Sequence, residues 1–233
     1  MSIHDGHRER LKKQFLKVGL DAFAEVNVLE MLLFYCIPRR DTNPIAHALL
    51  SRFGSLTAVL EAPVEELVKV EGISENAAIC LTFMTAVGRY YLVHKNTKET
   101  ILESIEKCGR YLAPFFIGCR NETVYLLCLD AKCKVLCCRA ISEGSVNAAG
   151  ISVRKVIEVA LASNATTVLL AHNHPSGLAL PSAEDVQTTK RISAALRVVD
   201  VKLADHLIIS DNDFVSLAQS GYYDPNMDYV MTK

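Results

Sequence analysis

The sequence predicts an α+β protein, with an all-helical domain over residues 1–95 followed by an α/β domain over residues 103–233. Apolar residues recur at helical spacing in the first part, whereas strand-length apolar runs begin only near residue 122. The polar stretch HKNTKET at residues 94–100 lacks apolar periodicity and separates the two patterns. Hydrophobic residues make up 50% and charged residues 22% of the chain, which is typical of a globular protein.

The helical domain contains recognisable helix starts and ends. Apolar residues over 29–36 follow helical spacing until Ile37-Pro38 interrupts the pattern. Asn43-Pro44 is typical of a helix start, and Gly54 of a helix end. A further short helix is expected after Pro63.

Residues 67–74, LVKVEGIS, form a tight turn before a second apolar helix, which is a helix-hairpin-helix-like pattern. In such modules the turn usually reads glycine, hydrophobic, glycine, so that backbone N–H groups can approach a phosphate. Here Ser74 replaces the second glycine, and Glu71 and Glu75 flank the turn with the wrong charge for DNA. A packing or partner-binding role is therefore as well supported as nucleic-acid binding.

Charge and localisation signals indicate an ordinary cytoplasmic protein. The net charge is −1, and the one basic cluster is expected to be a solvated helix face: Arg8, Arg10, Lys12, Lys13 and Lys17. Neither a signal peptide nor an apolar run of roughly 18 residues is present, so no membrane contact is expected. The 8 cysteines are expected to be free thiols. A metal site at Cys133 and Cys137 lacks a second well-spaced pair.

The second domain alternates helical and strand-like segments. A helix is expected from Ile101 to near Pro114, and a hairpin turn at 130–132 joins two apolar strands. The remaining expected elements are a helix over 153–161, a buried strand over 166–171, a helix after Ser182 and a strand over 206–210.

The segment most informative about function is AHNHPSGLALPSAED, residues 171–185, which follows the buried strand. His172 and His174 are two apart in extended chain, so their side chains point to the same side. Pro175 disfavours a helical conformation at His174 and keeps it aligned with His172. Both imidazoles can therefore bind one zinc ion at about 2.0–2.1 Å.

Asp185 is the third candidate ligand, separated from His174 by a loop that contains Gly and Pro. Ser182 is suited to cap the next helix, so that Asp185 lies in its first turn, where the helix dipole favours an ionised carboxylate. Ser182 and Asp185 alone are better explained as a capping box, but capping requires neither histidine. Three protein ligands leave a fourth position open, which is typical of a catalytic zinc site.

The motif of His172, His174, Ser182 and Asp185, with Glu122 upstream at the start of a strand, resembles that of the JAMM (MPN+) metallopeptidases. More narrowly, the whole chain resembles the RadC-like (UPF0758) bacterial proteins, through IPRRDTNP, FGSL, the hairpin, AHNHPSG and DHLI. The resemblance implies an MPN (JAB, cytidine-deaminase-like) domain with a curved, mostly antiparallel sheet.

The resemblance also implies a function. His172, His174 and Asp185 would bind one zinc ion, and Glu122 would be the acid/base residue for zinc-activated water attacking an amide or isopeptide carbonyl. Ser182 would donate to the oxyanion. A peptide or protein is the expected substrate, and the oligomeric state is not predicted. The alternative is a DNA-repair-associated protein that binds DNA through its N-terminal domain or is a metal-dependent nuclease.

Several assignments stay open on the residues alone. Glu122 is chosen by family position, and Glu143 and Glu158 compete with it. Family members that cleave ubiquitin-like isopeptide bonds usually have Ser or Thr between the histidines, whereas this chain has Asn173, so the substrate class does not transfer. Asp205 and His206 are adjacent in a strand and point to opposite faces, which favours a role in orienting the ligands over joint metal binding.

Overall fold

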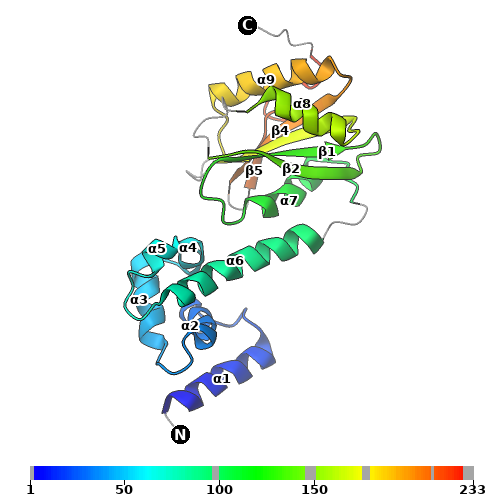
Figure 1. Ribbon diagram of the computed structural model, residues 1–233. Coiled ribbons are helices and arrows are strands. Elements are labelled where there is room, and N and C mark those ends of the chain that lie inside the picture. The colour runs from blue at the N-terminus through cyan, green and yellow to red at the C-terminus, as the bar shows by residue number, and fades with distance from the viewer. Residues whose placement is uncertain (1–2, 96–99, 145–150, 175–178, 211–212, 228–233) are drawn as a thin grey trace. The chain divides into compact units, whose positions relative to one another are not determined.

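The computed structural model describes residues 3–95, 100–144, 151–174, 179–210 and 213–227. It divides into two compact units, Met1–Tyr90 and Tyr91–Lys233 (Figure 1). Each unit has its own buried apolar side chains. Within the described residues, no helix has the length and apolarity that a bilayer crossing requires.

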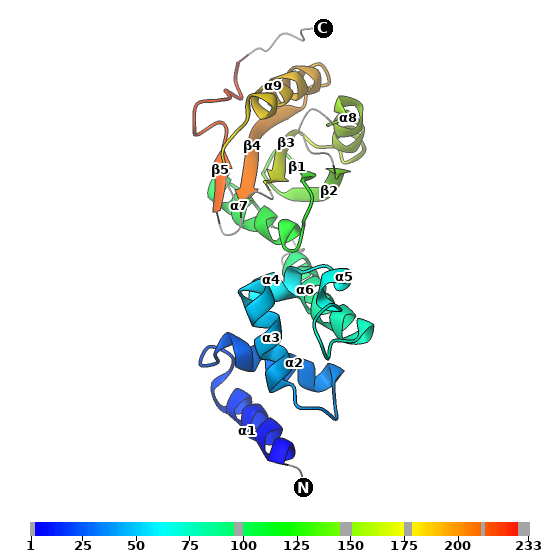
Figure 2. The same ribbon diagram turned by 90° about the vertical axis from the view of Figure 1, so that its left-hand side faces the viewer.

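The first unit is helical (Figure 2). Its helices are α1 (Ile3–Val18), α2 (Glu25–Cys36), α3 (Asn43–Phe53), α4 (Leu56–Glu61), α5 (Val64–Leu67) and α6 (Glu75–Lys95), the last of which extends into the second unit. The core contains side chains from α2 to α6, with Leu29, Leu33, Leu49 and Leu67 fully buried. Gly54 ends α3 with a φ of 90°, as the sequence predicts.

The turn before α6 explains the residues of the hairpin motif. Gly72 has a φ of +92°, and a Cβ at this position would lie 2.8 Å from Ile45 Cδ1, so a larger residue would be strained and would displace the Ile45 side chain. Ser74 stands where a second glycine is usual, and its hydroxyl accepts a hydrogen bond from the Ala77 N–H at 3.3 Å. Ser74 therefore stabilises the start of α6.

The expectation that the basic cluster is simply a solvated face is wrong for Arg8. Its guanidinium donates to the carbonyls of Ile37, Pro38 and Arg40 at 2.8, 2.9 and 2.6 Å. It also stacks over the Phe34 ring at 4.8 Å. Arg8 thus satisfies the carbonyls that follow α2, because the planar guanidinium offers several donors at once.

The second unit contains a five-stranded sheet in the order β2-β1-β3-β4-β5. The strands are β1 (Thr123–Leu129), β2 (Val135–Glu143), β3 (Thr167–Asn173), β4 (Lys202–Ser210) and β5 (Asp213–Ser216). The predicted mostly antiparallel sheet is wrong, since the sheet is mixed and β3 pairs with β4 in parallel. The physical reason is α9 (Ala183–Arg197), which crosses over between these two strands and returns the chain in the same direction.

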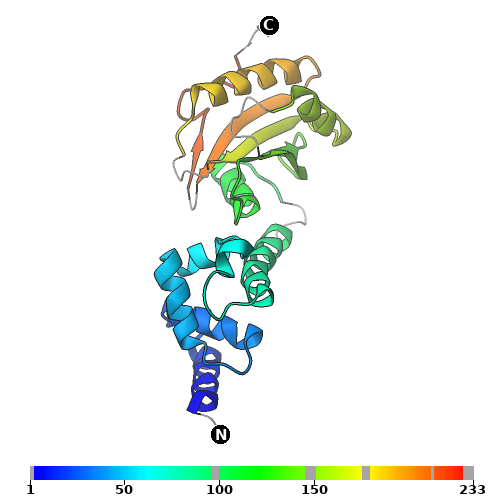
Figure 3. The same ribbon diagram turned by 60° about the vertical axis from the view of Figure 1, so that its left-hand side comes forward.

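Helices cover both faces of this sheet, as Figures 1 and 3 show. α8 (Val153–Ala162) and α9 pack on one face, while α7 (Ile105–Leu112) and the 3-10 helix η1 (Ala113–Phe116) pack on the other. β1 and β3 are consequently buried on both faces, which explains their continuous apolar runs. Ile101, expected to be helical, forms instead an isolated bridge with Lys134.

Candidate metal centre

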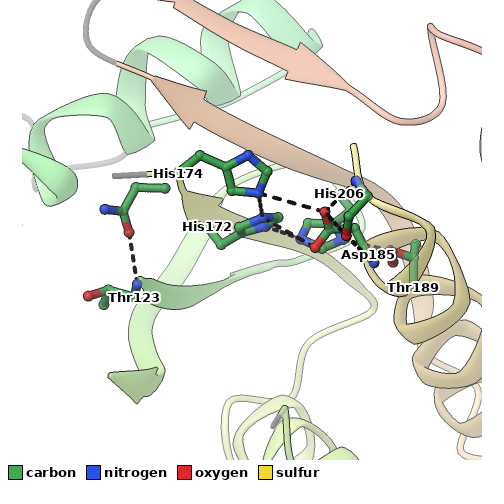
Figure 4. A network of polar contacts seen from close by, with 8 residues as sticks. Thr123, His172, His174, Asp185, Thr189 and His206 are labelled. Atoms are coloured by element: carbon green, nitrogen blue, oxygen red, sulfur yellow. Dashed lines mark hydrogen bonds and ion pairs between the residues drawn. The ribbon is translucent and has the colours of Figure 1, made fainter. Parts of the chain in front are cut away.

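The two histidines and the aspartate singled out by the sequence meet where β3 ends and α9 begins (Figure 4). His172 lies in β3, the central strand of the sheet, and is fully buried. His174 follows the strand, and its backbone N–H donates to the Ile209 carbonyl at 3.2 Å. Asp185 lies in the first turn of α9 and is buried. Pro175, with its predicted effect on His174, lies outside the described residues.

The ligand atoms of these three side chains all lie within 4.8 Å of one another. His172 Nε2 lies 3.3 Å from Asp185 Oδ1, and His174 Nε2 lies 3.7 Å from Asp185 Oδ2. A tetrahedral zinc ion with bonds of about 2.0–2.1 Å separates its ligands by about 3.4 Å. The two Nε2 atoms are closer, at 2.8 Å, and would have to separate slightly. The donor set, two imidazoles and one carboxylate, fits a zinc ion.

Ser182 and Asp185 form the capping box that the sequence indicates. The Ser182 backbone N–H and hydroxyl both donate to Asp185 Oδ2, at 2.8 and 2.7 Å. The Asp185 N–H in turn donates to Ser182 Oγ at 3.1 Å. Capping thus fixes the carboxylate with Oδ2 bonded to Ser182 and Oδ1 facing His172.

A second layer of polar side chains lies behind His172. His206 Nε2, from β4, lies 2.8 Å from His172 Nδ1, and Thr189 Oγ1, from α9, lies 2.6 Å from His206 Nδ1 (Figure 4). Asp205 faces away and accepts hydrogen bonds from the Ser216 hydroxyl and the Ala218 N–H. Asp205 and His206 therefore point to opposite faces of the sheet, and only His206 contacts a candidate ligand.

Burial favours the neutral form of two histidines at this site, His172 and His206. The pKa of His172 is lowered to about 4, mainly by burial; Asp185 opposes this shift and His174 adds to it. Burial likewise lowers the pKa of His206 well below its ordinary value, with His172 and His174 adding to the effect. A neutral imidazole is the form that binds a metal, so the site favours metal binding at neutral pH.

Glu122 immediately precedes β1 and is half-buried. Burial raises the pKa of its carboxyl group, the Asp185 carboxylate raises it further, and His174 opposes the shift. Glu122 is therefore close enough to the candidate ligands to interact with them electrostatically. Of the two competing glutamates, Glu158 is exposed and pairs with Arg154 at 2.7 Å, and Glu143 ends β2.

Asn173, between the two histidines, connects them to the segment that carries Glu122. Its side-chain oxygen accepts from the Thr123 N–H at 2.8 Å, and its amide nitrogen donates to the Asn121 carbonyl at 3.2 Å. These two backbone groups flank Glu122. The sequence indicated Asn173 only as a departure from a family pattern. It did not indicate a role for Thr189, apart from its position four residues after Asp185 on the same face of the helix.

A mixed sheet covered by helices, with a buried His-His-Asp cluster at one strand end, defines this unit as an α+β domain with a candidate metal centre. Residues 102–222 match the family model described as a RadC-like JAB domain. The chain is 32% identical over 230 residues to a UPF0758 protein of Fusobacterium nucleatum subsp. nucleatum, covering 94% of this chain and 97% of that protein. It is 34% identical over 223 residues to a UPF0758 protein of Stutzerimonas stutzeri, covering 95% and 100%. The chain therefore belongs to the RadC-like (UPF0758) family, and the predicted resemblance is confirmed.

Proposed function

We propose that the second unit is a single-zinc hydrolase of the JAMM metallopeptidase type, which cleaves an amide or isopeptide bond in a peptide or protein. The observation that carries the proposal is the convergence of His172, His174 and Asp185 at a buried strand end. The family relationship supports it, because JAB domains are compatible with a hydrolase.

His172 Nε2, His174 Nε2 and Asp185 Oδ1 are the atoms that would hold the zinc ion. Bound zinc supplies Lewis-acid polarisation and makes water acidic enough to react at neutral pH. The Asp185 carboxylate is fixed for this role by Ser182, and the His172 ring by its burial in β3.

Glu122 is the proposed acid/base residue. Its raised pKa brings the carboxyl group closer to neutral pH, where proton transfer in both directions is efficient. Glu122 would accept a proton from the attacking water and return it to the leaving amine. Asn173 supports this role, because its two hydrogen bonds fix the backbone on both sides of Glu122.

Ser182 is the proposed donor to the oxyanion. Its hydroxyl proton is directed at Asp185 Oδ2, so this role requires the hydroxyl to rotate toward the substrate. The Ser182 backbone N–H keeps its own bond to Asp185 Oδ2 during that rotation, and the carboxylate therefore stays in place.

Metal analysis of purified protein tests the proposal. The full chain is expected to hold about one zinc ion and to hydrolyse a peptide from a substrate panel. His174→Ala is expected to lose both zinc and hydrolysis, whereas the control His47→Ala, at an exposed position of α3, keeps both. Wild-type protein without zinc, or zinc content unchanged in His174→Ala, would contradict the proposal.

No contact in the described residues favours the alternative of DNA binding or DNA cleavage. Arg8 is bonded to backbone carbonyls, and the Gly72-Ile73-Ser74 turn forms a helix start. A salt titration of duplex and branched DNA binding tests this alternative, since binding through phosphates weakens steeply with salt. Metal-dependent DNA cleavage that is lost in Glu122→Gln would favour a nuclease over a peptidase.

A further inference from the structure

We propose that Thr189 and His206 form a hydrogen-bond relay that locks His172 in its Nδ1-protonated tautomer, so that the His172 Nε2 lone pair faces the candidate metal centre. Thr189 and His206 are thus positioning residues that contact neither metal nor substrate. The inference deepens the proposed function and rests on it for the identity of the metal site, but the hydrogen-bond geometry stands by itself.

The direction of the relay is fixed at the Thr189 end. Thr189 Oγ1 lies 2.6 Å from the Asp185 carbonyl oxygen and also 2.6 Å from His206 Nδ1. A carbonyl oxygen can only accept, and a threonine hydroxyl has a single proton, so Thr189 donates to Asp185. Both contacts are then hydrogen bonds only if His206 Nδ1 carries a proton and donates it to Thr189 Oγ1.

The protonation of His206 in turn fixes that of His172. His206 Nε2 lies 2.8 Å from His172 Nδ1, and both rings are fully buried. With its proton on Nδ1, a neutral His206 presents a lone pair at Nε2 and must accept. His172 Nδ1 therefore carries the proton, and His172 Nε2 is left as a lone pair 3.3 Å from Asp185 Oδ1.

The topology explains why these residues meet. His206 and His172 lie on the same sheet face of neighbouring parallel strands, since His206 pairs with Leu170, two residues before His172. Thr189 follows Asp185 by one helical turn on the inner face of α9. The relay consequently begins at the backbone of one candidate ligand, Asp185, and ends on the ring of another, His172. The relay therefore fixes the position of His172, the candidate ligand from β3, relative to Asp185, the candidate ligand from α9.

A histidine ligand commonly donates its second ring N–H to a carboxylate, a carbonyl or water, and loss of that partner weakens metal binding by about 10- to 100-fold. Here the partner is a second neutral imidazole, that of His206, which can accept at Nε2 only in the tautomer that carries its proton on Nδ1. This arrangement makes the Thr189 hydroxyl, two contacts away from the site, necessary for the orientation of the His172 proton.

Nitrogen-15 NMR of the histidine rings in the metal-free full chain tests the assignment without any variant. The expected pattern is Nδ1–H with a bare Nε2 for both His172 and His206. A His206 ring protonated on Nε2 would reverse the relay and overturn the inference. Because wild-type protein is measured, the result does not depend on whether a substituted chain folds.

Zinc affinity, measured by competition with a chromophoric chelator, gives the second readout. Thr189→Val keeps the shape of the side chain and removes the hydroxyl, and it is expected to weaken zinc binding by about 10- to 100-fold. The matched control Thr189→Ser keeps the hydroxyl and is expected to bind zinc like the wild type. Equal affinity in Thr189→Val and the wild type would overturn the inference. A wild-type chain with the expected tautomers that binds no zinc would support the relay and contradict the proposed function.

Discussion

The two units bury polar side chains to very different extents. Among the described residues, the buried polar or charged side chains of the helical unit are Glu30 and Thr42. Those of the second unit are Thr123, His172, Asn173, Asp185, Thr188, Thr189, Ser193, Asp205, His206 and Ser216. A buried polar group costs about 1–3 kcal/mol when it is left without a hydrogen bond.

Several buried polar side chains of the second unit gather around the candidate metal centre. The core of the helical unit consists of packed apolar side chains, and its stability does not depend on the protonation state of any group in it. The second unit instead holds a connected network of polar contacts at one end of its sheet, which links Asp185, Thr189, His206 and His172. Substitutions in the two units should therefore have different consequences, and four predictions test this contrast.

The largest effect is expected for Glu122→Gln, which keeps the shape of the side chain and removes its ability to accept a proton. Hydrolysis should fall by about 10²- to 10⁴-fold, with zinc content unchanged, because only the acid/base step is lost. The measurement is kcat on a cleaved peptide together with metal analysis. The control Glu158→Gln alters an exposed pair on α8 and should leave kcat unchanged. Equal losses in both variants would show that Glu122 has no special role.

The second prediction concerns pH and the metal-free protein. Burial lowers the pKa of His172 to about 4, against 6.5 in the unfolded chain. Between these values the unfolded state binds a proton that the folded state does not, so the free energy of unfolding decreases as pH falls. The contribution of His172 is almost fully lost near pH 4 and amounts to about 3 kcal/mol.

Hydrogen exchange of the β3 amides measures this pH dependence of the unfolding free energy in the second unit alone. Their protection should decrease as pH is lowered from about 6.5 to 4, after correction for the intrinsic exchange rate. His172→Gln removes one titrating group while His206, whose pKa burial also lowers, remains, so the dependence should become shallower without disappearing. A dependence of the same slope in His172→Gln would assign the effect to other groups and contradict the prediction.

The third prediction concerns Asn173, which should position Glu122 without contributing to metal binding. Asn173→Ala removes the contacts with Thr123 and Asn121, and kcat is expected to fall by about 10- to 100-fold because the carboxylate loses its alignment. Zinc affinity and KM should change little. Asn226→Ala, which removes an exposed contact with Lys202, is the control. A loss of zinc in Asn173→Ala would instead make Asn173 part of the metal centre.

Local chain geometry explains which parts of the site were predictable. The period of a strand places His172 and His174 on one side, and the cap at Ser182 places Asp185 in the first turn of α9. Both rules act over a few residues, so the sequence is enough. The network behind the site is different, because the contact between His172 and His206 depends on which strands become neighbours.

The incorrect and missed features likewise depend on contacts between residues far apart in the sequence. Apolar periodicity predicts most helices and strands of the second unit, but it does not predict the short strand β5. The parallel pairing of β3 with β4 depends on how α9 crosses the sheet. Thr189 is an ordinary helix residue in sequence, and only the tertiary structure places His206 against it. Charge spacing on α1 showed where the basic residues lie and could not show that Arg8 reaches the carbonyls beyond α2.

The smallest effect is expected for Arg8→Ala, which tests what stabilises the helical unit. Arg8→Ala removes hydrogen bonds to the Ile37, Pro38 and Arg40 carbonyls and the stacking on Phe34, so the unit should lose about 1–2 kcal/mol of unfolding free energy. The control Lys13→Ala removes an exposed charge of the same helix and should cost less than about 0.5 kcal/mol. Urea denaturation followed by far-UV circular dichroism measures both. Equal stability of Arg8→Ala and Lys13→Ala would show that Arg8 is only a surface charge. The zinc content of Arg8→Ala should stay at the wild-type level, because the contacts that Arg8 makes lie entirely within the first unit.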